Sequence, residues 1–176
     1  MEELGKNKKI TSNSVSLAGE FAVLSQLALR GFDANMTLGH TKGVDILVSN
    51  PETGKMYKLE VKTTFKDSRE KPSASKTFGD IVSSWMMGAK HEDMVDPDLF
   101  YCFVNIGKDT SVFKFYIVPN EVVSKYVKEQ HKLWLDEDPA RKNGDLRTFR
   151  IGLEKSIYKI PTPTAEKYEN NWEFKK

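Results

Sequence analysis

The chain has 176 residues, of which 39% are hydrophobic and 11% aromatic, which is enough for one domain with its own core. The formal net charge is only +2, so the composition does not mark a strongly basic nucleic-acid-binding protein. The sequence contains neither the run of roughly 18 to 20 apolar residues that a membrane span needs nor an apolar signal segment, so we expect a cytoplasmic protein.

The first predicted element is a helix from Val15 to Arg30, after a polar lead-in of residues 1–13. Its N-cap is expected at Ser12, Asn13 or Ser14, and Gly31 is placed where a helix ends. One apolar arc gathers Leu17, Phe21, Val23, Leu24, Leu27 and Ala28. Glu20 falls inside this arc. Because an unpaired carboxylate is costly to bury, we expect Glu20 to meet a cation, a hydrogen-bond donor or a metal.

Three strands are predicted next, at Phe32–Leu38, Val44–Ser49 and Met56–Thr64. The turn-forming residues 50–54 separate the second from the third, which predicts a hairpin. A helix is then expected from Thr77 to about Lys90, where apolar residues recur at helical spacing.

Two further strands, Leu99–Ile106 and Val112–Val118, are expected to pair across residues 107–109. The only cysteine, Cys102, lies in the first of them, which excludes disulfides within the chain and cysteine-rich zinc sites and indicates a core residue. Asn120 is expected to cap a helix that ends near Gln130, and residues 146–151 form a short strand. These elements predict an α/β fold whose core spans residues 14–135, with residues 136–176 as an extension packed on the same domain.

The pairing of the hairpin strands can be predicted from its turn. Centring the turn between Glu52 and Thr53 sets Ile46 against Leu59 and makes one face wholly apolar. This face pairs Val44 with Val61, Ile46 with Leu59, and Val48 with Tyr57. The same register sets Asp45 opposite Glu60 on the other, solvent-facing side, with side chains roughly 5 Å apart at Cβ. Lys62 shares that side because side chains alternate along a strand.

Two carboxylates placed opposite each other repel, so the pattern favours a bound divalent cation over a purely structural role. Mg²⁺ fits because it prefers oxygen ligands and is commonly held by one or two carboxylates, and Mn²⁺ is expected to substitute for it. No cysteine or paired histidine stands nearby to favour zinc. His40 is close in sequence, but a lone histidine is more often structural.

The segments Gly43-Val44-Asp45-Ile46-Leu47-Val48 and Leu59-Glu60-Val61-Lys62-Thr63-Thr64 resemble the core motif of the PD-(D/E)XK nucleases, with Val44 in place of the proline. The element order from about Ser14 to Ile106 is similar to the αβββαβ core of that restriction-endonuclease-like superfamily. The resemblance implies a mixed central sheet flanked by helices. It further implies that Asp45 and Glu60 bind metal, that the Val61 carbonyl adds a ligand and that Lys62 is catalytic, while Glu20 supports the metal or water.

The resemblance implies a metal-dependent DNA endonuclease. Candidate contacts to the nucleic acid are Lys42, Lys55, Lys58, Thr64, Lys66, Arg69 and Lys71. Two alternatives stay open: an RNA-directed nuclease, and a catalytically inactive module of the same fold that binds nucleic acid or protein. A homodimer is expected from symmetry, because cutting both strands of a duplex usually needs two active sites.

Charge is distributed unevenly between two neighbouring segments. Residues 55–76 hold seven basic and three acidic residues, whereas residues 80–98 hold five acidic residues and one lysine. The acidic segment should repel phosphate, so we expect it to contact a protein partner.

Overall fold

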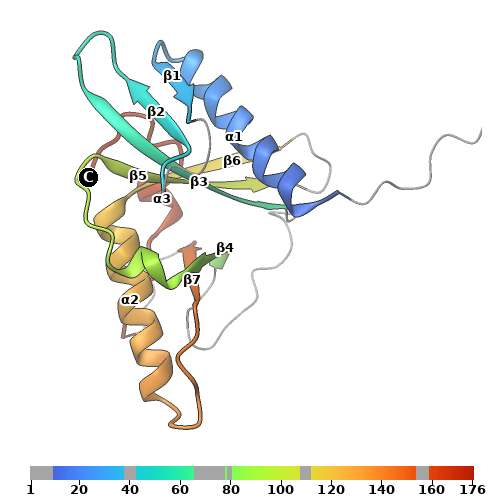
Figure 1. Ribbon diagram of the computed structural model, residues 1–176, viewed down its shortest axis with the longest axis vertical. Helices are drawn as coiled ribbons and strands as arrows, with labels where there is room; N and C mark the ends of the chain where they lie inside the picture. Colours follow the sequence, from blue (N-terminus) through green and yellow to red (C-terminus); the bar gives the residue numbers. More distant parts are fainter. Residues whose placement is uncertain (1–9, 38–42, 66–77, 79–80, 108–111, 154–158) are drawn as a thin grey trace, which may run out of the picture.

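The computed structural model describes residues 10–37, 43–65, 78, 81–107, 112–153 and 159–176. In chain order its elements are α1 (Ser12–Ala28), β1 (Asp33–Met36), β2 (Ile46–Ser49), β3 (Met56–Phe65), β4 (Ile81–Gly88), the 3₁₀ helix η1 (Ala89–Glu92), β5 (Leu99–Ile106), β6 (Phe113–Pro119), α2 (Asn120–Asp136), β7 (Leu146–Gly152) and α3 (Ala165–Tyr168). A five-stranded sheet runs in the order β1-β2-β3-β5-β6, and β4 pairs with β7 in a separate two-stranded sheet (Figure 1). Within the larger sheet β3 and β5 are parallel and the other pairs antiparallel. The predicted α/β class, with a mixed sheet flanked by helices, is confirmed.

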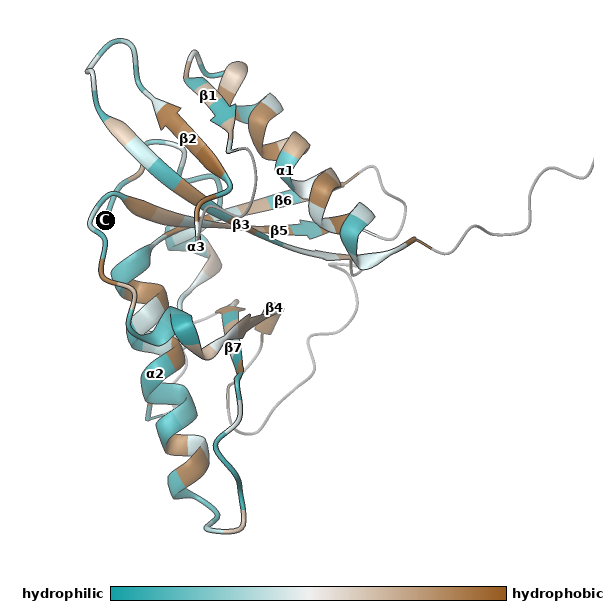
Figure 2. Ribbon diagram, viewed as in Figure 1, coloured by the Kyte–Doolittle hydropathy of each residue, from teal (hydrophilic) through white to brown (hydrophobic). Residues whose placement is uncertain are grey.

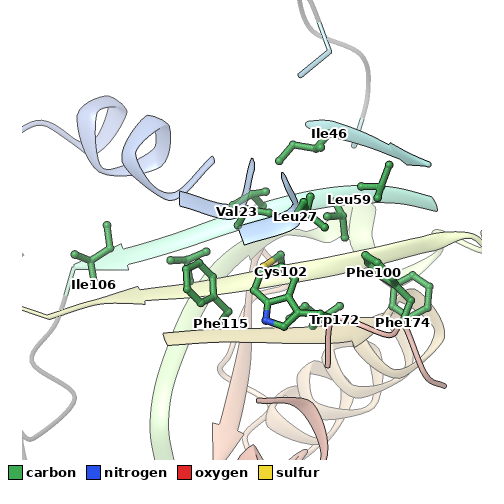
Figure 3. Close-up of a cluster of buried hydrophobic side chains, with 14 residues drawn as sticks. Val23, Leu27, Ile46, Leu59, Phe100, Cys102, Ile106, Phe115, Trp172 and Phe174 are labelled. Carbon is green, nitrogen blue, oxygen red and sulfur yellow. The ribbon is translucent and has the colours of Figure 1, made fainter. Parts of the chain in front are cut away.

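Two apolar cores cover the two faces of the five-stranded sheet. On one face, Val23 and Leu27 of α1 pack with Cys102 and with Trp172 and Phe174 from the C-terminal segment (Figure 3). The other core is built by β4, β7 and α2, which lie across the sheet from α1 (Figure 1). Cys102 is fully buried, as predicted, and burial raises the pKa of its thiol.

The first helix starts earlier than predicted and buries a different face. Thr11 is its N-cap, because its side chain accepts a hydrogen bond from the N–H of Ser14. Leu17 and Phe21 are exposed, at 43% and 56%, so the prediction that they belong to the core is wrong. The buried face instead contains Gly19, which the helical pattern had placed on the outside. A small residue is buried because α1 approaches β3 too closely there for any side chain.

The helix predicted from Thr77 to Lys90 is wrong: most of this segment is β4. Its inward-facing residues alternate with a period of two, since Ser83, Trp85 and Met87 are buried while Met86 is 67% exposed. The strand forms because β7, some 60 residues later in the chain, supplies its pairing partner and sets Trp85 opposite Phe149. Local spacing cannot reveal such a distant partner.

Helix α2 extends six residues beyond its predicted end at Gln130, to Asp136. Asn120 is its first helical residue rather than its cap, which is Pro119. Its inner face contributes Val123, Tyr126 and Val127 to the second core, while much of its remaining surface is hydrophilic (Figure 2). Among the helices that the structure describes, none combines the length and apolar character that crossing a membrane requires.

Candidate active site

The hairpin of β2 and β3 has the predicted register. Ile46 pairs with Leu59 and Val48 with Tyr57, and the apolar face of this hairpin packs into the first core. The ladder stops at Ile46, however, so Asp45 is not the direct partner of Glu60 that the register predicted. The backbone N–H of Asp45 donates to the Leu59 carbonyl at 2.8 Å.

The side chain of Asp45 replaces a backbone hydrogen-bond acceptor at the point where β2 leaves the sheet. Its Oδ2 accepts a hydrogen bond of 2.7 Å from the N–H of Val61, a donor that a longer β2 would have satisfied with a carbonyl. The N–H and C=O of one strand residue point to the same side, so the Val61 carbonyl also points toward Asp45. The end of β2 thus places a carboxylate and a carbonyl oxygen side by side.

Glu60 is 2% exposed, so the prediction that its side of the hairpin faces solvent is wrong. This side is covered because η1 and the segment that follows it lie against the sheet there. The ammonium of Lys62 lies 2.6 Å from Oε1 of Glu60, and Nε2 of His91 lies 3.5 Å from the same oxygen. Oε2 is buried without a hydrogen-bond partner among the described residues.

Gly43 leads the chain past this unpartnered oxygen. A Cβ at Gly43 would lie 3.2 Å from Oε2 of Glu60 and 2.8 Å from Cε of Met94, and the backbone has a φ of +74°. Both the positive φ and the close approach require glycine. The turn before Asp45 therefore packs directly against the Glu60 carboxylate.

Glu20 of α1 joins this group across the edge of the sheet. Desolvation raises the pKa of its half-buried carboxyl, the negative charge of Asp45 raises it further, and Lys62 opposes the rise. The pKa of Asp45 is raised mainly by desolvation, with a smaller contribution from Glu60, against the Val61 hydrogen bond and the positive charges of Lys62 and Lys90. Asp45 therefore lies near enough to Glu20, Glu60 and Lys62 for their charges to act on its carboxyl or be acted on by it, and Lys62 pairs directly with Glu60.

Two residues that the sequence did not single out complete the site. His91 of η1 is 1% exposed, and its Nδ1 lies 2.7 Å from the hydroxyl of Tyr101 on β5. Burial lowers the pKa of His91 to about 4, so the ring is neutral at pH 7, and burial raises the pKa of Tyr101. No sequence pattern marks this pair, because the parallel pairing that sets Tyr101 beside Glu60 is a tertiary contact.

The oxygen atoms gathered here fit a hard divalent cation. Asp45 and Glu60 supply carboxylates, and Glu60 has a buried oxygen with no partner among the described residues. The Val61 carbonyl is expected on the same side of β3 as its N–H, which donates to Asp45. Within the described ranges, no group of three or more His, Cys, Asp or Glu side chains is close enough to hold a metal. The described residues therefore do not form a complete zinc site, whereas Mg²⁺, which retains several waters, is commonly held by only one or two protein carboxylates.

The predicted nucleic-acid contacts do not all gather at this site. Lys55 is exposed and precedes β3 by one residue, roughly 23 Å along the strand from Lys62. Lys58 forms a 2.7 Å ion pair with Asp96, and Thr64 is half-buried. Lys42, Lys66, Arg69 and Lys71 lie outside the described residues, as does His40.

The acidic segment of residues 80–98 forms ion pairs within the chain. Asp96 binds Lys58, Asp93 binds Lys128 at 2.8 Å, and Glu92 binds the buried Arg147 of β7. These three acids therefore have intramolecular partners, and contact with another protein remains only a prediction for the segment.

No protein-family model matches the chain, and no curated protein matches it. Among solved structures it is similar to a bacterial homing endonuclease, I-Ssp6803I, at 12% identity and a TM-score of 0.48, over 94% of this chain and 91% of that one. A TM-score below 0.5 does not establish a common site, so the residues of this chain have to be judged by their own geometry.

Proposed function

We propose that this protein is a divalent-metal-dependent nuclease that hydrolyses phosphodiester bonds, with DNA as its substrate. The proposal is carried by one observation: where β2 leaves the sheet, Asp45 and Glu60 converge beside the ammonium of Lys62, and Oε2 of Glu60 is left without a partner among the described residues. Burying acids in this way is unfavourable for stability unless a cation offsets the cost.

Asp45, Glu60 and the Val61 carbonyl would hold Mg²⁺, or Mn²⁺ in its place. The bound ion would activate water and offset the charge that grows on the phosphate during hydrolysis. Asp45 is suited to this role because the Val61 N–H holds its Oδ2, while Oδ1 has no hydrogen bond to another residue that the structure describes. Gly43 lets the turn before Asp45 pack against Glu60, since any side chain there would crowd Oε2.

Lys62 would place its positive charge next to the reacting phosphate. Its side chain is 27% exposed, so the ammonium can meet a substrate while Glu60 holds it in position. A fixed ammonium stabilises charge that develops in the transition state without having to reorganise. Glu20, on α1, would accept a hydrogen bond from a water bound at the site, and its raised pKa makes its carboxylate a stronger base than an ordinary glutamate.

A catalytically inactive module with the same fold is the second candidate. Two observations favour it. The described residues do not place three side-chain metal ligands close together, and Lys62 is tightly paired with Glu60. Such a protein would bind nucleic acid or protein without metal.

The deciding experiment is a cleavage panel with metals added one at a time. Plasmid, linear, branched and single-stranded DNA, and RNA in parallel, are incubated with the native chain, Asp45→Asn and Lys62→Ala. Lys125→Ala is the matched control, because Lys125 has a 75% exposed side chain on α2 and its ion pair is with Glu129 of the same helix rather than with a site residue.

We expect the native chain and the control to cut DNA only with Mg²⁺ or Mn²⁺ and both site variants to be inactive. Cleavage of RNA alone would redirect the proposal to an RNA-directed nuclease. A folded native chain that cuts nothing with any metal, and binds no metal by calorimetry, would overturn the proposal in favour of the inactive module.

A further inference from the structure

Glu60 is held from behind by a short chain of buried polar groups. His91 is 1% exposed and Tyr101 fully buried, and both lie in the core on the side of the sheet away from α1. Polar groups that are buried in a core are nearly always hydrogen-bonded. The contacts from Tyr101 through His91 to Glu60 therefore constrain the orientation of each side chain.

The surroundings of His91 favour a proton on Nε2 of its neutral ring. Nε2 lies 3.5 Å from Oε1 of Glu60, so a proton on Nε2 faces the carboxylate, whereas the other tautomer would aim a lone pair at it. Nδ1 then accepts a hydrogen bond from the Tyr101 hydroxyl at 2.7 Å. The same hydroxyl lies 3.5 Å from Sδ of Met94 and also interacts with Glu60 and Asn120.

Both donors near Glu60 approach the same oxygen. Lys62 lies 2.6 Å and His91 3.5 Å from Oε1, whereas Oε2 points toward Gly43, on the side where Asp45 lies. A carboxylate turns about its last bond between two equivalent orientations. The close ammonium of Lys62 and the polar contact with His91 on one oxygen favour one of these orientations, which leaves the other oxygen facing the proposed metal position.

We infer that His91 and Tyr101 are positioning residues, which hold the Glu60 carboxylate so that Oε2 faces the cation. This inference rests on the proposed function, because it assigns these residues a part in the same metal site. Outer partners of metal ligands commonly contribute 10–100-fold to metal affinity, so removing them should weaken metal binding by about that factor.

The test measures Mn²⁺ and Mg²⁺ affinity by calorimetry, without substrate. His91→Phe keeps the ring volume but removes both nitrogens, and His91→Gln restores an amide donor near the Nε2 position. Tyr101→Phe removes one hydroxyl. Tyr116→Phe is the matched control, since Tyr116 is equally buried in the same core and its hydroxyl has no hydrogen-bond partner among the described residues.

We expect His91→Phe to weaken Mn²⁺ binding by about 10–100-fold. Tyr101→Phe should weaken it by a smaller factor, while His91→Gln and Tyr116→Phe stay within about threefold of the native chain. In cleavage, His91→Phe should need more Mg²⁺ for half-maximal rate and recover most of its rate at saturating Mg²⁺. A merely structural role would not produce this split.

Two results would overturn the inference while leaving the proposed function intact. One is native-like metal affinity in both His91→Phe and Tyr101→Phe. The other is equal loss in His91→Gln and His91→Phe, which would assign the effect to ring packing. If His91→Phe does not fold, Tyr101→Phe and His91→Gln decide. A native chain that binds no metal would instead refute the proposed function itself.

Discussion

Gly19 of α1 lies against Thr63 of β3 so closely that a Cβ built on the glycine would be 1.9 Å from Oγ1 of Thr63. The contact brings the helix down onto the strand one residue before Glu20 and one residue after Lys62. The distance between these two functional candidates is therefore set by a position that has no side chain.

Replacing Gly19 with alanine should destabilise the protein, although alanine is the better helix former. At an open helical position this change is worth about 1 kcal/mol of stabilisation. Here the methyl group would overlap Thr63, so we expect a net loss of about 1–3 kcal/mol in the free energy of unfolding, measured in urea. Cleavage should fall as well, because Glu20 is pushed away from Lys62.

Thr63→Ala in the same chain should recover part of that loss, because it removes the atom that the new methyl group meets first. Ser25→Ala, at an exposed position of α1, is the control and should change stability little. Stabilisation by Gly19→Ala would show that the helix does not approach the strand this closely.

Neutralising the site acids should make the metal-free protein more stable and less active. The pKa values of Asp45 and Glu20 are raised in the fold, so their ionised forms are less favourable there than in the unfolded chain. Their contribution to stability is full below the unfolded pKa and is lost as pH rises through the folded value. At pH 7 Asp45→Asn should therefore raise the melting temperature, since the amide oxygen can still accept from Val61, while cleavage is lost.

Glu20→Gln should shift the melting temperature in the same direction. The gain should disappear when both proteins are compared near pH 3, where the native carboxyls are themselves protonated. Added Mg²⁺ should stabilise the native chain and not Asp45→Asn. If Asp45→Asn or Glu20→Gln is less stable than the native chain at pH 7, burial of the ionised carboxylate does not destabilise the fold and the prediction is wrong.

His91 should make the metal-free protein sensitive to mild acid. Its pKa falls from 6.5 to about 4 on folding, so the unfolded chain binds a proton over this range and the folded chain does not. The stabilisation is full above pH 6.5 and is lost as pH falls to about 4, by on the order of 3 kcal/mol. Urea unfolding at pH 7, 6, 5 and 4 would measure it.

Asp45 and Glu20 change the pH dependence of stability in the opposite direction, and they do so in both the native chain and His91→Gln. The difference in the free energy of unfolding between these two proteins therefore isolates the effect of His91. The native chain should lose its advantage as pH falls from 6.5 to 4. A difference that does not change with pH would mean that His91 titrates normally in the fold.

The sequence was sufficient for the hairpin and its acids because their signals are local. A turn at residues 50–54 and alternating apolar residues determine that Ile46 meets Leu59, and this pairing carries Asp45 and Glu60 toward each other. The same local signals could not show that β2 ends at Ile46. That end depends on the turn at Gly43, whose backbone is fitted around Glu60 and Met94.

The errors fall where distant parts of the chain decide the structure. Trp85 lies in a strand because β7 pairs with it, and Glu60 is buried because η1 and its neighbours cover it. His91 and Tyr101 were missed for the same reason. Their roles depend on the parallel pairing of β3 with β5 and on the path of the chain after β4, neither of which leaves a local pattern.

The lysine most useful for holding DNA near the site should be Lys90 rather than Lys58. Lys90 is exposed on η1, and its charge acts on the carboxyl of Asp45. Lys58 is already paired with Asp96 at 2.7 Å, which reduces the charge it can offer to a phosphate.

Each lysine that contacts a phosphate contributes about 0.9 to the slope of log affinity against log salt. Lys90→Ala should therefore lower that slope by about one and weaken DNA binding, as measured by fluorescence anisotropy with Ca²⁺ replacing Mg²⁺ to prevent cutting. Lys58→Ala should change both quantities much less, and Asp96→Asn should raise affinity by freeing Lys58. Equal losses in the two lysine variants would mean that the ion pair opens when DNA binds, and that the path of the DNA extends along β3 toward its start.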